Sequence, residues 1–394
     1  MTPVLPQPQS LPERMRAVLL TGHGGLDRLE FRDDVPVPAP APDEVLIAVG
    51  ACGMNNTDIN TRTAWYSRSV TEATSGATSG AASGATGGAT GGEGAGGFEA
   101  ARAGDSTWGG VGLRFPRIQG ADVAGRIVAV GADVAETRLG ERVLVDPWLR
   151  DPEDPGDRAK AGYLGSECDG GYAEYTTVPA VNAIAIESAL TDAELATFPC
   201  SSSTAEHMLA KARLGAGETL LVTGASGGVG SALVQLGKRR GAYVIAVAGS
   251  SKIAAVRALG ADAVIAREAP DLEAAVRAAS PGGEVAVAAD IVGGPGFPGL
   301  LDLLARGGRY VTSGAIAGPR VELDLRTLYL KDLELLGATV MPRGIFEDLV
   351  GYIERGAIKP LLARTFPLEA LREAQVAFLE KKHVGNFVIL PGGG

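Results

Sequence analysis

The sequence predicts an α/β protein with two domains, an antiparallel β-domain followed by a doubly wound parallel sheet. Two observations predict this class. Short alternating strands interrupted by prolines fill the N-terminal part, and apolar runs alternate with helix-period segments from Thr219 to Ser313. A length of 394 residues is sufficient for two hydrophobic cores, and 45% hydrophobic with 21% charged residues is ordinary for a globular protein.

The composition narrows the partners and the compartment. A formal net charge of −10 argues against a nucleic acid or an anionic membrane as the main partner. We find no run of 18 apolar residues and no signal-peptide pattern, so we expect a cytoplasmic protein without a membrane partner. Three cysteines, Cys52, Cys168 and Cys200, are too few and too scattered for a disulfide framework.

The N-terminal part begins with residues 1–14, which we expect to form a loose tail. The best strand that follows, Glu44–Ala51, leads into the polar segment Cys52–Asn60, for which we expect a loop that carries chemistry. Residues 73–92 are five tetrads of small residues, which cannot bury enough apolar area to offset the entropy of ordering. We therefore expect a flexible insertion over 72–106, without catalytic residues.

A capping box, Thr191 with Glu194, predicts a helical region over Asp192–Arg213 that is broken near Pro199. Helices and strands then alternate. The expected elements are helix 252–259, strand 262–266, helix 271–279, strand 285–291, helix 298–305, strand 309–313, strand 333–340, helix 344–355, a helix from near 367, and strand 386–390.

Residues 218–252 hold the strongest functional motif. The apolar run Thr219–Thr223 precedes a glycine cluster, a helix-period segment Val229–Arg239 and a second apolar run Tyr243–Ala248. Glycines let a pyrophosphate approach the N–H groups of a helix N-terminus, whose partial positive charge attracts it. The alternative is a purely structural tight turn. We expect a dinucleotide to contact Gly224, Ala225, Ser226, Gly227, Gly228 and Val229.

The residues after the second apolar run favour NADPH over NADH. Dinucleotide sites usually place an Asp or Glu there to hold the ribose 2′-OH. This chain has only hydroxyls and a cation at that point, which suit a 2′-phosphate, and a second cation follows the next strand. In the alternative interpretation the cations are ordinary solvated surface charges. The residues concerned are Gly249, Ser250, Ser251, Lys252 and Arg267.

Several ordered motifs resemble the medium-chain dehydrogenase/reductase superfamily. They are Gly-x-x-x-x-Asp at 53–58, Gly-x-Asp-x-Ala-Gly at 120–125, Gly-Glu-Arg-Val at 140–143 and the glycine turn at 224–230. The chain looks most like the quinone oxidoreductase and enoyl reductase branch. This resemblance implies a GroES-like catalytic domain over 15–201, a Rossmann NADP(H)-binding domain over 202–332 and a return to the catalytic domain over 333–394. It also implies a homodimer that extends the parallel sheet through an edge strand, with 309–317 and the following region as candidates.

The zinc-dependent alcohol dehydrogenases of this superfamily bind zinc at three positions, which here hold Asn55, Ala121 and Cys200. One thiol does not provide the three or four ligands that zinc needs, so we predict no metal. The branch without zinc adds hydride to the β-carbon of a conjugated C=C bond, and hydrogen bonds stabilise the enolate. A substitute set of ligands would be Cys200, Asp122, Glu167 and His207.

The resemblance also suggests site residues. Thr57 matches a proton-relay hydroxyl with Asp58 beside it, Asn55 is a candidate amide donor, and Tyr66 resembles the tyrosine that quinone reductases present to a small-molecule substrate. A capped turn and a loop-packing aromatic are the structural alternatives. Further cofactor contacts are expected from Thr204, Val292, Gly314, Ala315, Ile316 and Asn386.

Two other functions stay open at this point. One is a C=O or C=N reductase or dehydrogenase of a specialised pathway, which the same residues would support. The other is a non-catalytic NADPH-binding protein.

Overall fold

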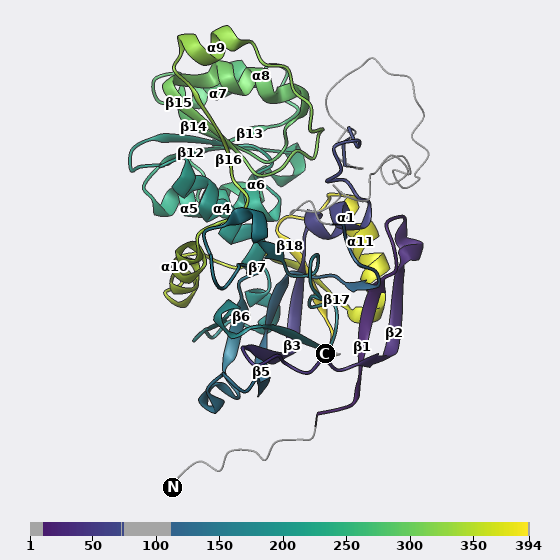
Figure 1. The fold of residues 1–394 in the computed structure, drawn as a ribbon. Coiled ribbons are helices and arrows are strands. Elements are labelled where there is room, and N and C mark those ends of the chain that lie inside the picture. The colour runs from purple at the N-terminus through teal and green to yellow at the C-terminus, as the bar shows by residue number, and fades with distance from the viewer. Residues whose placement is uncertain (1–10, 72, 75–111, 393–394) are drawn as a thin grey trace.

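The computed structural model describes residues 11–71, 73–74 and 112–392. Figure 1 shows an N-terminal β-rich domain below and a domain with a helix-covered sheet above, with α4 (Pro199–Lys211) between them. Most of the predicted tail and nearly all of the predicted insertion lie outside the described residues. No helix among the described residues is long and apolar enough to cross a membrane.

The lower domain contains a small and a large sheet. The small sheet has the order β2-β1-β4, and the large sheet has the order β10-β6-β5-β3-β18-β17, with β9 also paired to β3. Most residues of β3 are buried, which explains its continuous apolar sequence. A further, two-stranded sheet pairs β7 with β8. The strands are β1 (Arg14–Leu20), β2 (Leu29–Pro36), β3 (Glu44–Met54), β4 (Arg117–Ile118), β5 (Asp122–Val130), β6 (Arg142–Val145), β7 (Trp148–Leu149), β8 (Gly162–Tyr163), β9 (Tyr175–Pro179), β10 (Ala183–Ala185), β17 (Leu362–Pro367) and β18 (Asn386–Leu390).

The upper domain is built on a parallel six-stranded sheet of order β13-β12-β11-β14-β15-β16. Leu220 and Val222 of β11 pack with α4, α5 and α10, whereas Leu221 packs with α7 and α8. Both faces are therefore covered, and the expected doubly wound sheet is confirmed. Its elements are β11 (Thr219–Val222), α5 (Gly228–Arg239), β12 (Tyr243–Ala248), α6 (Ile253–Arg257), β13 (Ala263–Ala266), α7 (Leu272–Ala279), β14 (Val285–Asp290), α8 (Phe297–Leu303), β15 (Leu304–Thr312), α9 (Leu325–Leu330), β16 (Glu334–Gly337) and α10 (Arg343–Glu354).

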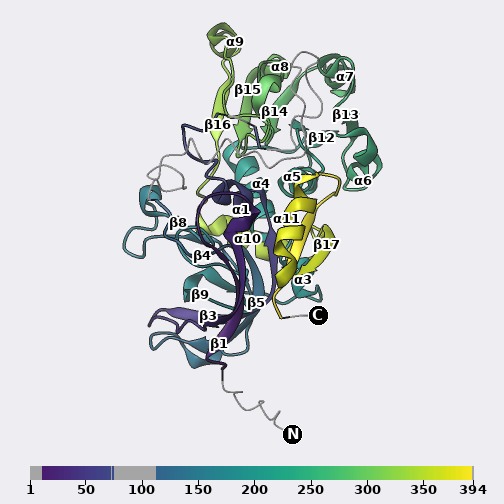
Figure 2. The same ribbon diagram turned by 90° about the vertical axis from the view of Figure 1, so that its right-hand side faces the viewer.

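The C-terminal segment joins the lower domain. β18 pairs antiparallel with β3, so that Phe387 lies opposite Met54, and β17 pairs parallel with β18. Figure 2 shows α11 (Leu371–Leu379) and β17 beside the N-terminal strands. Phe366 and Phe387 enter the same hydrophobic core as Met15 and Val45. β17 was not predicted from the sequence.

Three local predictions need comment. The break in the helical region is confirmed, because α3 (Asp192–Leu195) ends before Pro199 begins α4. The expected loop over 52–60 is wrong: its first residues extend β3, and α1 (Asn56–Arg62) follows because the Asp58 carboxylate accepts a bond from Asn55 N at 2.8 Å. Of the candidate edge region, 309–317 is wrong because β15 lies between β14 and β16, whereas the region that follows contains β16, which is one edge of the sheet.

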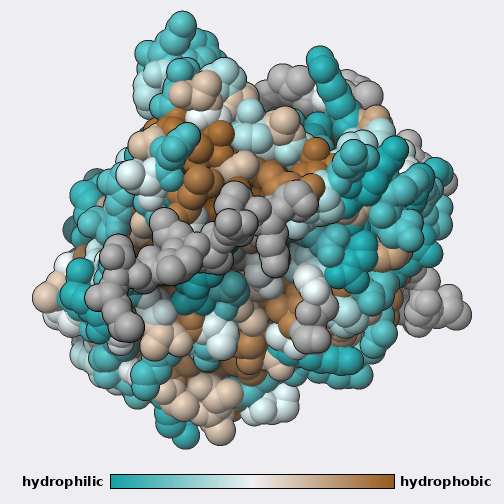
Figure 3. Space-filling model, turned by 90° about the horizontal axis from the view of Figure 1, so that it is seen from below, coloured by the Kyte–Doolittle hydropathy of each residue, from teal (hydrophilic) through white to brown (hydrophobic). Residues whose placement is uncertain are grey.

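Figure 3 views the molecule from the side of the lower domain. Hydrophilic residues surround this face, and hydrophobic residues gather near its middle.

Candidate functional site

The glycine turn lies where β11 meets α5. Gly224 has φ +59°, and a Cβ at Gly230 would lie 2.2 Å from the Gly224 carbonyl oxygen, so neither position accommodates a side chain without strain. Gly227, the N-cap of α5, makes no side-chain capping bond. The N–H groups of the first turn of α5 are therefore suited to an anion.

The loops after β14 and β15 lie beside this turn. Ala317 N donates to Val292 O at 2.8 Å, and a Cβ at Gly224 would lie 3.2 Å from Val292 Cγ2. The predicted residues Val292 and 314–316 therefore gather at the carboxyl edge of the sheet, where ligands bind in such folds. Asp290 holds this edge by accepting bonds from Val292 N at 2.8 Å and Tyr310 OH at 2.6 Å.

Asp290 was not predicted. Its signal in the sequence is an acid that ends an apolar strand before two glycines.

Two lysines lie on the side of the turn that faces the lower domain. Lys252 Nζ donates to Lys381 O and lies 3.5 Å from Ser226 Oγ. Lys381 Nζ donates to Asn56 Oδ1 at 2.8 Å. Neither lysine takes part in an ion pair among the described residues. Burial, followed by the charge of Lys252, lowers the pKa of Lys381 to about 7.

Lys381 was not predicted either. Asn386 is the one cofactor residue that the sequence predicts after β16, although a Lys-Lys-His run precedes it.

The ribose end of the predicted site differs from expectation. No acid follows β12, but Glu268 from the end of β13 accepts bonds from Ser250 N at 3.0 Å and Ser250 Oγ at 2.9 Å. Arg267 Nη2 lies 2.9 Å from Glu268 Oε1. The predicted cation Arg267 is thus paired with a carboxylate that was not predicted, although no acid stands directly after β12.

The positions that match zinc ligands lie together in the lower domain. Asn55 Nδ2 donates to Asp122 Oδ2 at 2.9 Å, and Cys200 N donates to Asp122 Oδ1 at 2.9 Å. Burial raises the pKa of the Asp122 carboxyl and also that of the Cys200 thiol. The thiol is therefore a poor nucleophile at neutral pH.

These residues do not fit a catalytic zinc ion. No three His, Cys, Asp or Glu side chains in the described ranges are arranged to hold a metal. In the substitute set, Glu167 accepts a bond from Tyr163 N at 2.8 Å, and burial lowers the pKa of His207 to about 4. One thiol beside a carboxylate that accepts two N–H hydrogen bonds falls short of the three or four ligands that zinc needs.

Asp58 and Thr57 are neighbours in α1 but make different side-chain contacts. The Asp58 carboxylate accepts bonds from Asn55 N at 2.8 Å and from Tyr172 OH at 2.9 Å, and burial raises its pKa to about 6. These contacts favour the structural alternative for Asp58. Tyr66 OH donates to Thr57 Oγ1 at 3.2 Å, which brings two predicted site hydroxyls together.

A second tyrosine adjoins this group. Burial raises the pKa of the Cys200 thiol, and hydrogen bonding with the neighbouring side chains of Tyr163 and Thr204 opposes that shift. The predicted cofactor residue Thr204 therefore lies beside the Cys200 thiol, which stands where relatives with zinc have a metal ligand. Tyr163 was missed because it lies within a charged segment without apolar periodicity.

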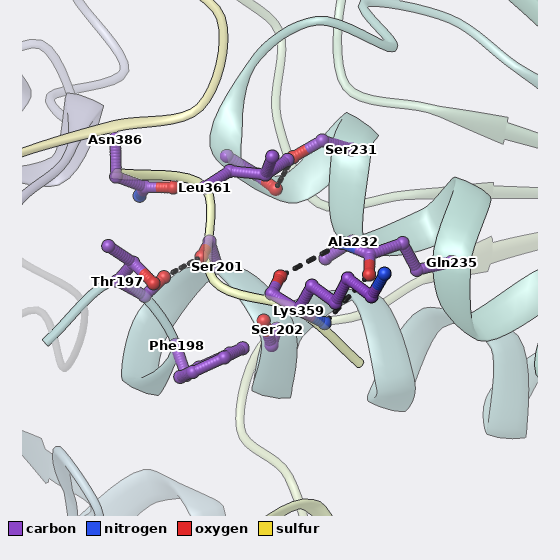
Figure 4. Close-up of a pocket in the computed structure, with 11 residues that line it drawn as sticks. Thr197, Phe198, Ser201, Ser202, Ser231, Ala232, Gln235, Lys359, Leu361 and Asn386 are labelled. Atoms are coloured by element: carbon purple, nitrogen blue, oxygen red, sulfur yellow. Dashed lines mark hydrogen bonds between the residues drawn. The ribbon is translucent and has the colours of Figure 1, made fainter. Parts of the chain in front are cut away.

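Figure 4 shows a pocket on the flank of α5. The side chain of Asn386 approaches this flank, because a Cβ at Gly228 would lie 2.8 Å from Asn386 Nδ2. Asn386 thus packs behind the glycine turn, and its contact with a cofactor stays a prediction. The pocket is lined by Thr197, Phe198, Ser201, Ser202, Gly228, Ser231, Ala232, Gln235, Lys359, Leu361 and Asn386.

Comparison with known proteins adds independent findings. Residues 228–355 match the zinc-binding dehydrogenase family, and residues 99–188 match the alcohol dehydrogenase GroES-like domain. The chain is similar to acryloyl-coenzyme A reductase of Metallosphaera sedula, with 31% identity over 70% of this chain and 84% of the relative. It is also similar to quinone oxidoreductase of Rattus norvegicus, with 26% identity over 95% of this chain and 98% of the relative.

A solved structure is similar over almost the whole chain. It comes from Sinorhizobium meliloti 1021 and is described as a candidate alcohol dehydrogenase. Its sequence is 48% identical, and the TM-score is 0.84 over 97% of this chain and 98% of the other.

Proposed function

Since this chain belongs to the medium-chain dehydrogenase/reductase superfamily and is quinone- and enoyl-reductase-like, we propose that it is a zinc-independent reductase of an activated C=C bond. The substrate would be a small quinone or α,β-unsaturated carbonyl compound, and NADPH, when bound, supplies the hydride. The observation that carries the proposal is the hydrogen bonding of Asn55 and Cys200 to Asp122, where relatives with zinc have metal ligands.

The residues fit a dinucleotide phosphate. The glycine turn leaves room and N–H groups for a pyrophosphate, and Lys252 and Lys381 supply positive charge that no carboxylate of the described residues neutralises. Ser250 and Arg267 would hold the 2′-phosphate. Thr204, Val292 and residues 314–316 would line the nicotinamide side.

The second requirement is to stabilise the charge that develops on the substrate. Negative charge develops on the carbonyl oxygen as the conjugated bond is reduced, and fixed hydrogen-bond donors lower the energy of that state. We assign this role to the hydroxyls of Tyr66 and Thr57. Burial raises the pKa of Tyr66, so the phenol stays protonated. Its one O–H group, which donates to Thr57 Oγ1, would turn to the substrate oxygen, while solvent supplies the proton to the α-carbon.

A second candidate function is reduction of a C=O bond. The similarity to a candidate alcohol dehydrogenase favours it. The same hydroxyls would then protonate or stabilise an alkoxide, and without a Lewis acid this charge would depend on protein donors alone.

Deuterium transfer distinguishes the candidates. The chain would be dialysed against EDTA and given NADPH deuterated at C4 with an α,β-unsaturated ketone or a quinone. Our proposal predicts undiminished turnover and, from the ketone, deuterium on the β-carbon. Deuterium on the carbonyl carbon would support the second candidate, and turnover that requires added zinc would contradict zinc independence. NADPH binding without turnover over many acceptors would indicate a non-catalytic protein.

A further inference from the structure

The ribose end of the coenzyme site contains a carboxylate that the proposed reaction does not use. Glu268 Oε2 accepts bonds from Ser250 N at 3.0 Å and Ser250 Oγ at 2.9 Å, and Glu268 Oε1 lies 2.9 Å from Arg267 Nη2. Ser250 and Arg267 are two of the residues that would hold a 2′-phosphate. Glu268 therefore occupies donors that an anionic ligand would need.

The position of Glu268 matches the place where the ribose arrives. A Cβ at Gly249 would lie 3.6 Å from Glu268 Oε1 and 3.9 Å from Arg267 Nη2, so both side chains lie over the end of β12. In dinucleotide-binding folds, an acid at the end of this strand accepts the ribose 2′-hydroxyl. Here the carboxylate reaches the same place from the end of the neighbouring strand β13.

The charge of Glu268 determines which group on the ribose can bind beside it. A carboxylate accepts a hydrogen bond from a hydroxyl but repels a phosphate group. The bonds from Ser250, and then the neighbouring backbone and Arg267, lower the pKa of Glu268 to about 2, so it is ionised at neutral pH. The side chain is 42% exposed, which leaves it room to move.

We propose that Glu268 determines the coenzyme preference. Bound to Ser250 and Arg267, its carboxylate accepts the 2′-hydroxyl of NADH, and it must release both groups before a 2′-phosphate binds. Glu268 thus lowers the ratio of the affinity for NADPH to the affinity for NADH, so that NADH also serves as a coenzyme. This inference rests on the coenzyme site of the proposed function but not on the bond that is reduced.

The test measures binding of two nucleotide fragments, 2′,5′-ADP and 5′-AMP, which differ only in the 2′-phosphate. Dissociation constants would be determined by calorimetry for the wild type and for Glu268→Gln, which keeps the shape of the side chain and removes its charge. We expect Glu268→Gln to bind 2′,5′-ADP about fivefold more tightly, as for loss of one half-exposed charge contact, and to bind 5′-AMP no better. The gain should shrink at high salt because screening weakens the repulsion.

Two further variants complete the test. Glu284→Gln removes an exposed carboxylate just before β14, at the amino edge of the same sheet, and should leave both constants unchanged. The double variant Arg267→Gln, Glu268→Gln should lose the gain in 2′,5′-ADP affinity. An unchanged ratio of the two constants in Glu268→Gln would overturn the inference. If the fragments bind in the expected pattern but the chain shows no turnover, only the proposed function is refuted. If neither fragment binds, the proposed function and this inference are both refuted.

Discussion

At the scale of residues, the polar groups of the candidate site are held by one another. Asp122 accepts bonds from Asn55 and Cys200, and Asp58 accepts bonds from Asn55 and Tyr172. Buried carboxylates need such donors because burial without them is costly. The groups left for a substrate are hydroxyls.

Tyr66 should therefore matter more to turnover than to coenzyme binding. We expect Tyr66→Phe to lower kcat about 10- to 100-fold, since removal of one donor to a developing oxyanion costs up to about 1000-fold in other enzymes. Binding of NADPH should stay the same, as measured by fluorescence titration. Tyr175→Phe, in β9 of the same domain, is the control and should retain full activity. A rise in KM alone would indicate that Tyr66 only packs against the substrate.

We expect Lys381 to make coenzyme binding depend on pH. Its pKa of about 7 lies below the ordinary lysine value of about 10.4, so the positive charge is lost in the folded chain as pH rises through 7. We expect NADPH to bind more weakly above pH 7 for this reason. Lys381→Met should weaken binding about tenfold at pH 6, as for loss of one charged contact, and should flatten this pH dependence.

Stability gives a second measurement of the same group. Between pH 7 and the unfolded value the unfolded chain binds more protons at Lys381, so this lysine makes the free energy of unfolding rise with pH in that window. Chemical denaturation at several pH values measures it, and Lys381→Met should remove this contribution. The neighbouring Lys382, 80% exposed, provides the control Lys382→Met, which should change neither measurement.

At the scale of elements, each helix end near the site has a different purpose. The first turn of α1 is closed by the Asp58 carboxylate, which stabilises the helix after the main strand. The first turn of α5 begins at Gly227 and makes no side-chain cap. The end with the open N–H groups is the one suited to a phosphate.

Two glycines of this turn should respond differently to alanine. A Cβ at Gly230 would lie 2.2 Å from Gly224 O, whereas a Cβ at Gly227 would meet only Gly224 O, at 3.7 Å. We expect Gly230→Ala to lower the free energy of unfolding by about 1–3 kcal/mol or more, because backbone must move. Gly227→Ala should fold normally and lose NADPH affinity, because its methyl group would face the phosphate. Thermal unfolding and NADPH titration measure the two effects, and equal loss of stability in both variants would contradict this explanation.

At the scale of the whole molecule, the two domains are joined by the C-terminal segment. β18 pairs with β3 in the lower domain, and Gly385 N, just before β18, donates to Ser226 O of the glycine turn at 3.0 Å. The segment therefore connects the glycine turn to the sheet whose strand β3 leads into α1. In the upper domain, β16 ends the parallel sheet, and its outer edge pairs with no further strand of the residues that the structure describes.

We propose that two copies of the chain associate through this edge. Large apolar side chains are exposed beside it, with Leu325 at 63%, Tyr329 at 61% and Leu330 at 57% on α9. Such a cluster is typical of a protein interface. Leu330→Glu should convert a dimer into a monomer in light scattering coupled to gel filtration, and Val181→Glu, at a position 56% exposed in the lower domain, should not. A monomeric wild type would contradict this proposal.

The sequence by itself determined the order of most elements of the parallel-sheet domain and the position of the glycine turn, because apolar periodicity and the need for residues without side chains are local properties. It also indicated that Asn55 and Cys200 stand where zinc ligands stand in relatives. Tertiary structure alone placed Glu268 on Ser250, Lys381 beside Lys252 and β17 beside β18. These contacts join residues from different elements, and no local pattern records which strands become neighbours. No acid directly follows β12, as the sequence indicated, and Glu268 was missed for the same physical reason, since it arrives from the adjacent strand.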